Sequence, residues 1–241
     1  MTSGPTLVVA GLPSAGKTTI CRLLAGHIGG ILVPEHNDWI GGSQNFPPAP
    51  RNVEEKIAKQ EFFLSIDLAR ARWAAERRVR GETVLSDSDF LAPLAHNFAE
   101  RWLLPELDIY EWMVDRYSRL LLDQDLWPAD AYIYLDVPLG ERIMRRRLDT
   151  RLRADFFFEE PFASNMRLFY ETILCGDSGL RAAWLPYDAP LEVEEARAAE
   201  AARRLLSESD PPEVERLVAA LRRSVDVVGD RRVPEGASRP V

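Results

Sequence analysis

A glycine-rich segment directly after the first apolar run constrains this chain more than any other feature of its sequence. Residues 11–18 read GLPSAGKT and fit the pattern GxxxxGK followed by Ser or Thr at every fixed position. An apolar run over 6–10 precedes the segment, and apolar residues at helical spacing follow it over 18–28. A strand, a glycine-rich turn and a helix in this order predict a phosphate-binding loop, or P-loop, on a parallel sheet.

Each residue type in this loop has a physical role in holding a nucleoside triphosphate. The glycines let the backbone turn tightly so that its N–H groups point inward, and the helix start adds partial positive charge. Lys17 is expected to reach the β- and γ-phosphates, and the hydroxyl of Thr18 is expected to bind Mg²⁺. The residues predicted to hold the nucleotide are Gly11, Pro13, Ser14, Ala15, Gly16, Lys17, Thr18 and Thr19.

The rest of the chain alternates between short apolar runs and longer helical patterns. The further strands are expected at 30–34, 83–86, 131–135 and 185–187. Helices are expected over 53–79, 91–104, 162–174, 192–206 and 213–225, and after Pro105 and Pro138. Residues 36–52 contain Gly41, Gly42 and three prolines and predict a long loop. Alternating strands and helices without an internal repeat predict an α/β fold with a five-stranded parallel sheet.

Length, charge and cysteine content limit the classes of protein that this chain can represent. Its 241 residues suit one P-loop domain over 1–207, with a short C-terminal helix and a flexible tail over 208–241. A net charge of −8 argues against a nucleic-acid partner. No apolar run approaches the roughly 20 residues of a membrane span, and the first residues lack the basic region of a secretory signal. Two isolated cysteines, Cys21 and Cys175, indicate a reduced cytoplasmic protein.

The segments after the third and fourth expected strands separate the classes of P-loop protein. A GTPase needs a base-reading NKxD near the fourth strand, but that strand continues into LDVP at 135–138. A mechanical ATPase needs an acidic pair after an apolar strand, whereas the third strand ends in VLSDSD at 84–89. Neither pattern is present, which leaves a kinase as the favoured class.

The order of the remaining motifs resembles the thymidylate kinase and deoxynucleoside kinase superfamily over about residues 5–190. Residues 87–97 (DSDFLAPLAHN) are similar to the stretch that follows the family's third strand. Residues 134–138 (YLDVP) and 141–145 (ERIMR) match its fourth strand and the start of its lid. Residues 162–174 (FASNMRLFYETIL) resemble its aromatic helix. The resemblance implies a three-layer α/β/α kinase that transfers the γ-phosphoryl group of Mg·ATP to a small acceptor, a nucleoside or nucleotide.

The resemblance also implies roles for individual residues outside the P-loop. Asp87 would act in catalysis and in holding Mg²⁺, and Glu35 would be the general base for the acceptor hydroxyl. An arginine-rich lid over 142–160 would close on the phosphates and bring in Arg147, Arg151 and Arg153, while Arg142 would lie against the adenine. The family also implies a homodimer.

Two departures from the family pattern concern the acceptor. The arginine that relatives carry after the acidic residue is Ser88 here, and the family's Glu-Pro order after the second strand is Pro34-Glu35. Ser88 favours an uncharged acceptor, because an acceptor phosphate would need another cation, such as Arg51 or Arg101. A kinase for a non-nucleotide hydroxyl, such as a natural product or antibiotic, is therefore the first alternative. A nucleotide-binding regulator without transferase activity is the second.

Two groups of apolar and aromatic residues are open to more than one interpretation. The first is a stripe that suits either the core or helix pairing between subunits: Leu107, Tyr110, Val114, Tyr117 and Leu121. The second includes candidates for stacking on a base, although packing is their usual role: Trp39, Phe46, His96, Trp102 and Trp112.

Overall fold

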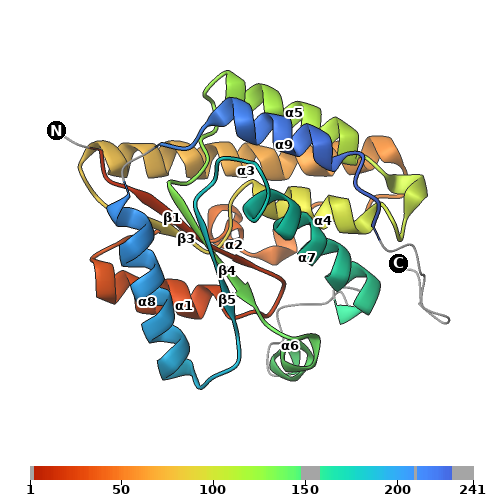
Figure 1. The fold of residues 1–241 in the computed structure, drawn as a ribbon. Coiled ribbons are helices and arrows are strands. Elements are labelled where there is room, and N and C mark those ends of the chain that lie inside the picture. Colours follow the sequence, from red (N-terminus) through yellow and green to blue (C-terminus); the bar gives the residue numbers. More distant parts are fainter. Residues whose placement is uncertain (1–2, 148–157, 209–210, 230–241) are drawn as a thin grey trace.

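A five-stranded parallel sheet forms the centre of the molecule (Figure 1). The computed structural model describes residues 3–147, 158–208 and 211–229. The strand order is β2-β3-β1-β4-β5, and each neighbouring pair is parallel. The strands are β1 (Thr6–Gly11), β2 (Ile31–Leu32), β3 (Val84–Ser86), β4 (Ala131–Asp136) and β5 (Ala182–Pro186). The P-loop follows the central strand, β1, so it lies between the ends of β3 and β4.

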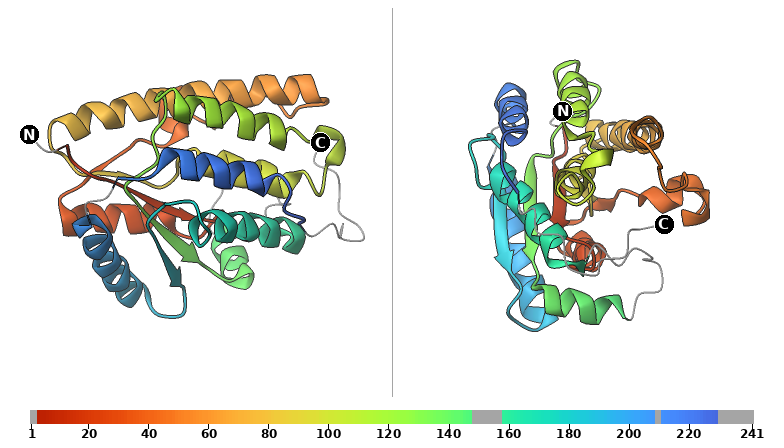
Figure 2. Two further views of the ribbon diagram at one scale, coloured as in Figure 1. Left: turned by 45° about the horizontal axis from the view of Figure 1, so that its top comes forward. Right: turned by 90° about the vertical axis from the view of Figure 1, so that its right-hand side faces the viewer.

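Helices cover both faces of the sheet and make a three-layer architecture (Figures 1 and 2). One face carries α1 (Lys17–Ile28) and α8 (Leu191–Ser207). The other face carries α3 (Val53–Val79), α4 (Leu91–Glu100), α5 (Tyr110–Leu122) and α7 (Glu160–Leu174). The C-terminal helix α9 (Val214–Ser224) packs against α5 and α7. The shorter elements are α2 (His36–Ile40), the 3₁₀ turns η1 (Ser43–Asn45) and η2 (Pro105–Leu107), and α6 (Leu139–Arg146).

The alternation of side chains along β1 explains why both faces need a helical cover. Leu7 and Val9 point toward the α1 and α8 side, while Val8 and Ala10 point toward the α4, α5 and α7 side. All four are at most 4% exposed. A strand with apolar residues at every position is typical of a parallel sheet that is buried on both faces.

The expected fold class and the five-stranded parallel sheet are confirmed. The prediction of a loop over 36–52 is wrong at its start, because His36–Ile40 forms one helical turn. The backbone N–H of Glu35 donates to Oδ2 of Asp38 at 3.1 Å, and this bond stabilises the start of the turn. The glycines and prolines that indicated a loop begin only at Gly41, so they do not act on the preceding five residues.

The helix expected after Pro105 begins differently from the prediction. Pro105–Leu107 forms a 3₁₀ turn, and α5 begins at Tyr110. The carboxylate of Asp108 accepts the N–H of Tyr110 at 2.8 Å and thereby stabilises the new helix start. The predicted helix over 91–104 ends earlier, at Glu100.

The apolar stripe of α5 is part of the core of a single chain. Tyr110, Val114, Tyr117 and Leu121 are each at most 2% exposed. Helix α9 packs over α5, and the hydroxyl of Tyr110 lies 2.6 Å from Oγ of Ser224. The packing interpretation of the stripe is therefore confirmed, and the homodimer stays a prediction. The tail expected at the C-terminus lies largely outside the described residues.

Among the described residues, no helix combines the length and apolar character needed to cross a membrane.

We expect the packing of α9 to contribute strongly to stability. Leu221 is fully buried in the cluster that also contains α5 and α7 side chains. Leu221→Ala should lower the free energy of unfolding by about 2–5 kcal/mol, because it leaves a cavity in the core. Urea denaturation measures this change, with Arg222→Ala on the exposed face of the same helix as the control. Equal midpoints for the two variants would contradict the assigned role of α9.

Candidate active site

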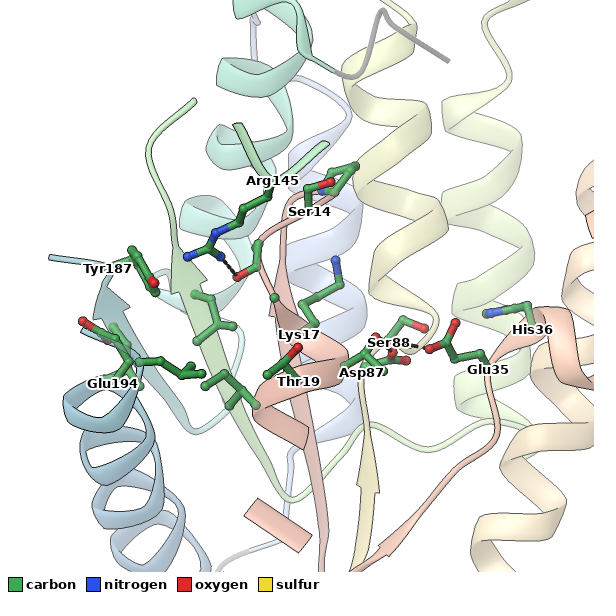
Figure 3. Close-up of a pocket in the computed structure, with 18 of the residues that line it drawn as sticks. Ser14, Lys17, Thr19, Glu35, His36, Asp87, Ser88, Arg145, Tyr187 and Glu194 are labelled. Carbon is green, nitrogen blue, oxygen red and sulfur yellow. Dashed lines mark hydrogen bonds between the residues drawn. The ribbon is translucent and has the colours of Figure 1, made fainter. Parts of the chain in front are cut away.

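One cavity of about 730 Å³ lies at the carboxyl ends of the strands, above the P-loop (Figure 3). The P-loop forms its floor, and the cavity has two sides. We call the first the β2 side, lined by Glu35, His36, Phe46, Asp87 and Ser88. We call the second the α8 side, lined by Arg145, Leu185, Tyr187, Leu191 and Glu194. The volume suits a ligand of nucleotide size.

The backbone of the P-loop takes conformations that require glycine at two positions. Gly11 has a φ of 146°, and a Cβ there would approach the carbonyl oxygen of Leu135 to 3.0 Å. Gly16 has a φ of 91° and is the N-cap of α1. A Cβ on Gly16 would come within 3.2 Å of Nη1 of Arg145. Side chains at these two positions would strain the turn that presents backbone N–H groups to phosphate oxygens.

Lys17 is held inside the loop at the first position of α1. Its Nζ donates to the carbonyl oxygen of Leu12 at 3.0 Å. Burial lowers the pKa of Lys17, and the nearby carboxylate of Asp87 opposes that effect. The start of α1 adds partial positive charge at the same place, so the arrangement can bind an anion.

Two carboxylates from different strand ends meet at the hydroxyl of Thr18. Oγ1 of Thr18 lies 2.6 Å from Oδ2 of Asp87 and 3.2 Å from Oε1 of Glu35. Asp87 follows β3, which pairs with β1, and Glu35 follows β2, which pairs with β3. A set of hydroxyl and carboxylate oxygens fits Mg²⁺, which prefers one or two carboxylates together with substrate phosphates. Thr18 and Asp87 could therefore hold that ion, with the carboxylate of Glu35 beside them.

The α8 side brings an arginine over the P-loop. Nη1 of Arg145 donates to the carbonyl oxygen of Ala15 at 2.9 Å, and its guanidinium lies 4.2 Å from the ring centre of Tyr187. The carboxylate of Glu194 accepts the N–H groups of Asp188 and Ala189 and so holds the turn after β5. An aromatic ring, aliphatic side chains and a cation at this side can accommodate a base and a phosphate chain.

The predicted lid arginines have different positions relative to the cavity. Arg142 is 2% exposed beside the P-loop, with Nη1 at 3.5 Å from the carbonyl oxygen of Pro13, and burial lowers its pKa. Arg147 is exposed at the end of α6. Neither side chain is part of the cavity wall, which instead includes Arg145. Arg151 and Arg153 lie outside the described residues, as does most of the lid expected over 142–160.

The β2 side has an aromatic corner. Nε2 of His36 lies 2.8 Å from Oδ1 of Asp67, a buried residue of α3. The rings of His36 and Phe46 both lie edge-on to Phe63, at centroid distances of 6.4 and 5.1 Å. Of the five aromatic candidates from the sequence, Phe46 lines the cavity, while Trp39, His96, Trp102 and Trp112 are not part of its wall.

An arginine does lie next to Ser88, although neither Arg51 nor Arg101 is that residue. Nη2 of Arg70, on α3, donates to the carbonyl oxygen of Ser88 at 3.1 Å. Arg51 instead pairs with Glu55, and Arg101 bonds to Asp108 and the carbonyl oxygen of Val225. Neither Arg51 nor Arg101 is part of the cavity wall, and Arg70 lies behind that wall, so none of the three is placed to meet an acceptor phosphate.

Several residues that the structure brings to the site were not predicted from the sequence. Arg145 stood in an arginine cluster with no feature that distinguished it from its neighbours. Tyr187 directly follows the last strand. Its position could have identified it, because ligands bind at the carboxyl ends of the strands in open parallel sheets. Arg70 gave no signal, because an arginine in a 27-residue charged helix reads as a surface residue.

A three-layer α/β/α fold with a P-loop on its central strand matches the folds of P-loop kinases. Solved structures with this architecture include a deoxyadenosine kinase from M. mycoides with bound dCTP. It is 17% identical, has a TM-score of 0.58, and the match covers 84% of this chain and 98% of that one. The thymidylate kinase from Candida albicans is 12% identical, with a TM-score of 0.63 and coverage of 88% and 97%.

The comparisons confirm the predicted resemblance to the thymidylate kinase and deoxynucleoside kinase superfamily at the level of the fold. No protein-family model matches the chain. No curated protein matches it by sequence. The roles of individual residues therefore depend on the geometry of this site.

We predict that nucleotide chemistry in this cavity depends on Lys17. Lys17→Ala should lower kcat about 100-fold or more, because the ammonium offsets charge on the phosphates and contributes little to the core. Arg22→Ala, which removes an exposed cation from the same helix, is the matched control and should retain activity. A folded Lys17→Ala protein with near-normal turnover would exclude phosphoryl transfer at this site.

We predict that Asp87 sets the metal requirement. Asp87→Asn keeps the shape of the side chain but removes its charge, so the Mg²⁺ concentration for half-maximal activity should rise about 10–100-fold. Asp115→Asn, an exposed carboxylate on α5, controls for the loss of one negative charge. If both variants show the wild-type Mg²⁺ dependence, Asp87 has no part in holding the ion.

Proposed function

We propose that this protein is a kinase that transfers the γ-phosphoryl group of ATP, with Mg²⁺, to the hydroxyl group of a nucleoside. The observation that carries the proposal is the approach of Asp87 and Glu35 to the hydroxyl of Thr18 within the P-loop cavity. A loop that only binds a nucleotide needs no second carboxylate at that point, whereas phosphoryl transfer needs both a metal ligand and a base for the attacking hydroxyl.

Each end of the cavity has a separate task in this proposal. The α8 side takes the base and ribose of ATP, and the P-loop N–H groups and Lys17 hold its phosphates. Mg²⁺, when bound, neutralises charge on the β- and γ-phosphates. Glu35 accepts the proton of the acceptor hydroxyl as its oxygen attacks the γ-phosphorus, with Asp87 beside it at Thr18. The bond between the γ-phosphorus and the β–γ bridging oxygen breaks, and ADP leaves with that oxygen.

Arginines supply the remaining positive charge as the reaction proceeds. Arg145 already lies over the P-loop, bonded to Ala15. We propose that it acts together with Arg147, Arg151 and Arg153 of the lid, and that Arg142 supports the nucleotide from beside Pro13. A planar guanidinium can bind two phosphate oxygens at once, which suits charge that spreads over the γ-phosphoryl group.

The β2 side favours an uncharged acceptor with a flat ring. Among the described residues that line this side, there are two carboxylates and no lysine or arginine. A phosphate group would meet these negative charges without an available cation. Phe46 and His36 offer aromatic surfaces, and stacking on an aromatic side chain is worth about 1–3 kcal/mol per base. A nucleoside meets both conditions.

The similar proteins support a nucleoside or nucleotide acceptor. They are a deoxyadenosine kinase and a thymidylate kinase, and one structure of the former holds bound dATP. The two cysteines, Cys21 and Cys175, are unpaired, which fits action in the cytoplasm.

An ATP-consumption screen against paired acceptors tests the proposal. The kcat/KM for nucleosides should be at least about tenfold above that for their 5′-monophosphates. The 5′-phosphate would add negative charge beside the carboxylates of Glu35 and Asp87. Ser88→Arg should lower the ratio of kcat/KM for the nucleoside to that for the monophosphate, because it adds a cation on the β2 side. Ser207→Arg, at an exposed position of α8, is the matched control.

Other results of the screen have distinct meanings. Wild-type preference for a monophosphate by orders of magnitude would contradict the assignment of an uncharged acceptor. Turnover of neutral alcohols alone would favour the non-nucleotide alternative. Nucleotide binding without transfer to any acceptor would favour a regulator.

A further inference from the structure

One buried arginine connects the segments that carry the two carboxylates of the site. Arg70 is 4% exposed and lies on α3, below the β2 side of the cavity. Its Nε donates to the carbonyl oxygen of Pro34 at 3.2 Å, and its Nη1 lies 3.3 Å from Nδ1 of His36. Both contacts are to the segment after β2.

The other side of the same guanidinium contacts the segment after β3. Nη2 of Arg70 donates to Oγ of Ser86 at 3.0 Å and to the carbonyl oxygen of Ser88 at 3.1 Å. The hydroxyl of Ser86 also donates to the carbonyl oxygen of Ser88, at 2.5 Å. One side chain therefore bridges two segments that are about 50 residues apart in the sequence.

The contacts of Arg70 fall on the residues directly before and after each carboxylate. Pro34 and His36 enclose Glu35, and Ser86 and Ser88 enclose Asp87. Because both neighbours of each carboxylate are held, the two backbone segments cannot separate without breaking bonds to one rigid group. The two carboxylates that lie between these contacts are the ones that approach Oγ1 of Thr18.

The charge of Arg70 is balanced inside the protein. Nη1 lies 3.5 Å from Oδ1 of Asp67, one turn earlier on α3, and Asp67 also contacts His36 and the hydroxyl of Tyr117. Arg70 does not line the cavity, so it is not placed to bind a substrate phosphate. A buried arginine with a countercharge and several protein acceptors is suited to fixing geometry.

We propose that Arg70 is the positioning residue of this site: it holds Asp87 where the metal–nucleotide complex binds and Glu35 where the acceptor hydroxyl loses its proton. The inference rests on the proposed function for the meaning of the two carboxylates. Lysine is not equivalent here, because its ammonium is a compact point charge without the rigid fork of donors that contacts both segments.

The test compares Arg70→Lys with Arg78→Lys. Arg78 is on the same helix and also binds a carbonyl oxygen and a carboxylate, those of Gly4 and Asp130, away from the cavity. Calorimetric titration with the Mn²⁺ complex of a non-hydrolysable ATP analogue should show affinity about 10–100-fold weaker for Arg70→Lys, the range for lost support of a metal ligand. The affinity of Arg78→Lys should stay within about twofold of wild type, since Arg78 does not contact the segments that carry Glu35 and Asp87.

A second measurement does not depend on nucleotide or activity. Amide hydrogen exchange over 33–38 and 86–90 should become faster in Arg70→Lys and remain at the wild-type rate in Arg78→Lys. If Arg70→Lys does not fold, Ser86→Ala removes one acceptor of the same guanidinium and should change both measurements in the same direction, by less.

The outcomes separate this inference from the proposed function. Wild-type affinity and exchange in a folded Arg70→Lys or Ser86→Ala protein would overturn the role of Arg70, even if the wild type is a kinase. Equal losses in Arg70→Lys and Arg78→Lys would also overturn it, because they would reflect general destabilisation. A wild-type protein that does not bind the Mn²⁺–nucleotide complex would overturn the proposed function, and exchange would still decide whether Arg70 holds the two segments.

Discussion

The parallel pairing of β1 with β3, and of β3 with β2, is the constraint on which the site depends. Parallel pairing brings the carboxyl ends of these strands to one edge of the sheet, so the P-loop, Asp87 and Glu35 meet there. The two carboxylates repel each other, and they are far apart in the sequence, so the chain itself does not hold them close. The hydroxyl of Thr18 and the bridge formed by Arg70 hold them together.

The helical layers make this arrangement rigid. Helix α3 is 27 residues long and begins with Asn52, whose side chain accepts the N–H of Glu55 at 2.8 Å. Its length carries Arg70 and Asp67 to the sheet edge while its C-terminal half supports the start of β1 through Arg78. Helix α9 packs against α5 and α7, and its apolar side chains belong to the same core cluster.

Most of the architecture and the floor of the site could be predicted from local sequence. The bounds of α3 agree with the periodic pattern over 53–79, and Lys17 and Thr18 stand where the P-loop motif requires them. The prediction was weaker where contacts are distant in sequence. Arg145 could not be separated from adjacent arginines, and the turn at His36–Ile40 was missed because the nearby glycines dominate that stretch.

The sequence by itself determined that this chain forms a parallel α/β sheet with a phosphate-binding loop on its first strand. Those features arise from residues that are neighbours in the chain: apolar runs, glycines with positive φ and the start of a helix. Only the tertiary structure decided which cation stands beside Ser88 and how Glu35 meets Asp87. These contacts join α3 to the segments after β2 and β3 through a buried guanidinium. The partners of a buried charge depend on how distant elements pack, so the local sequence pattern does not reveal them.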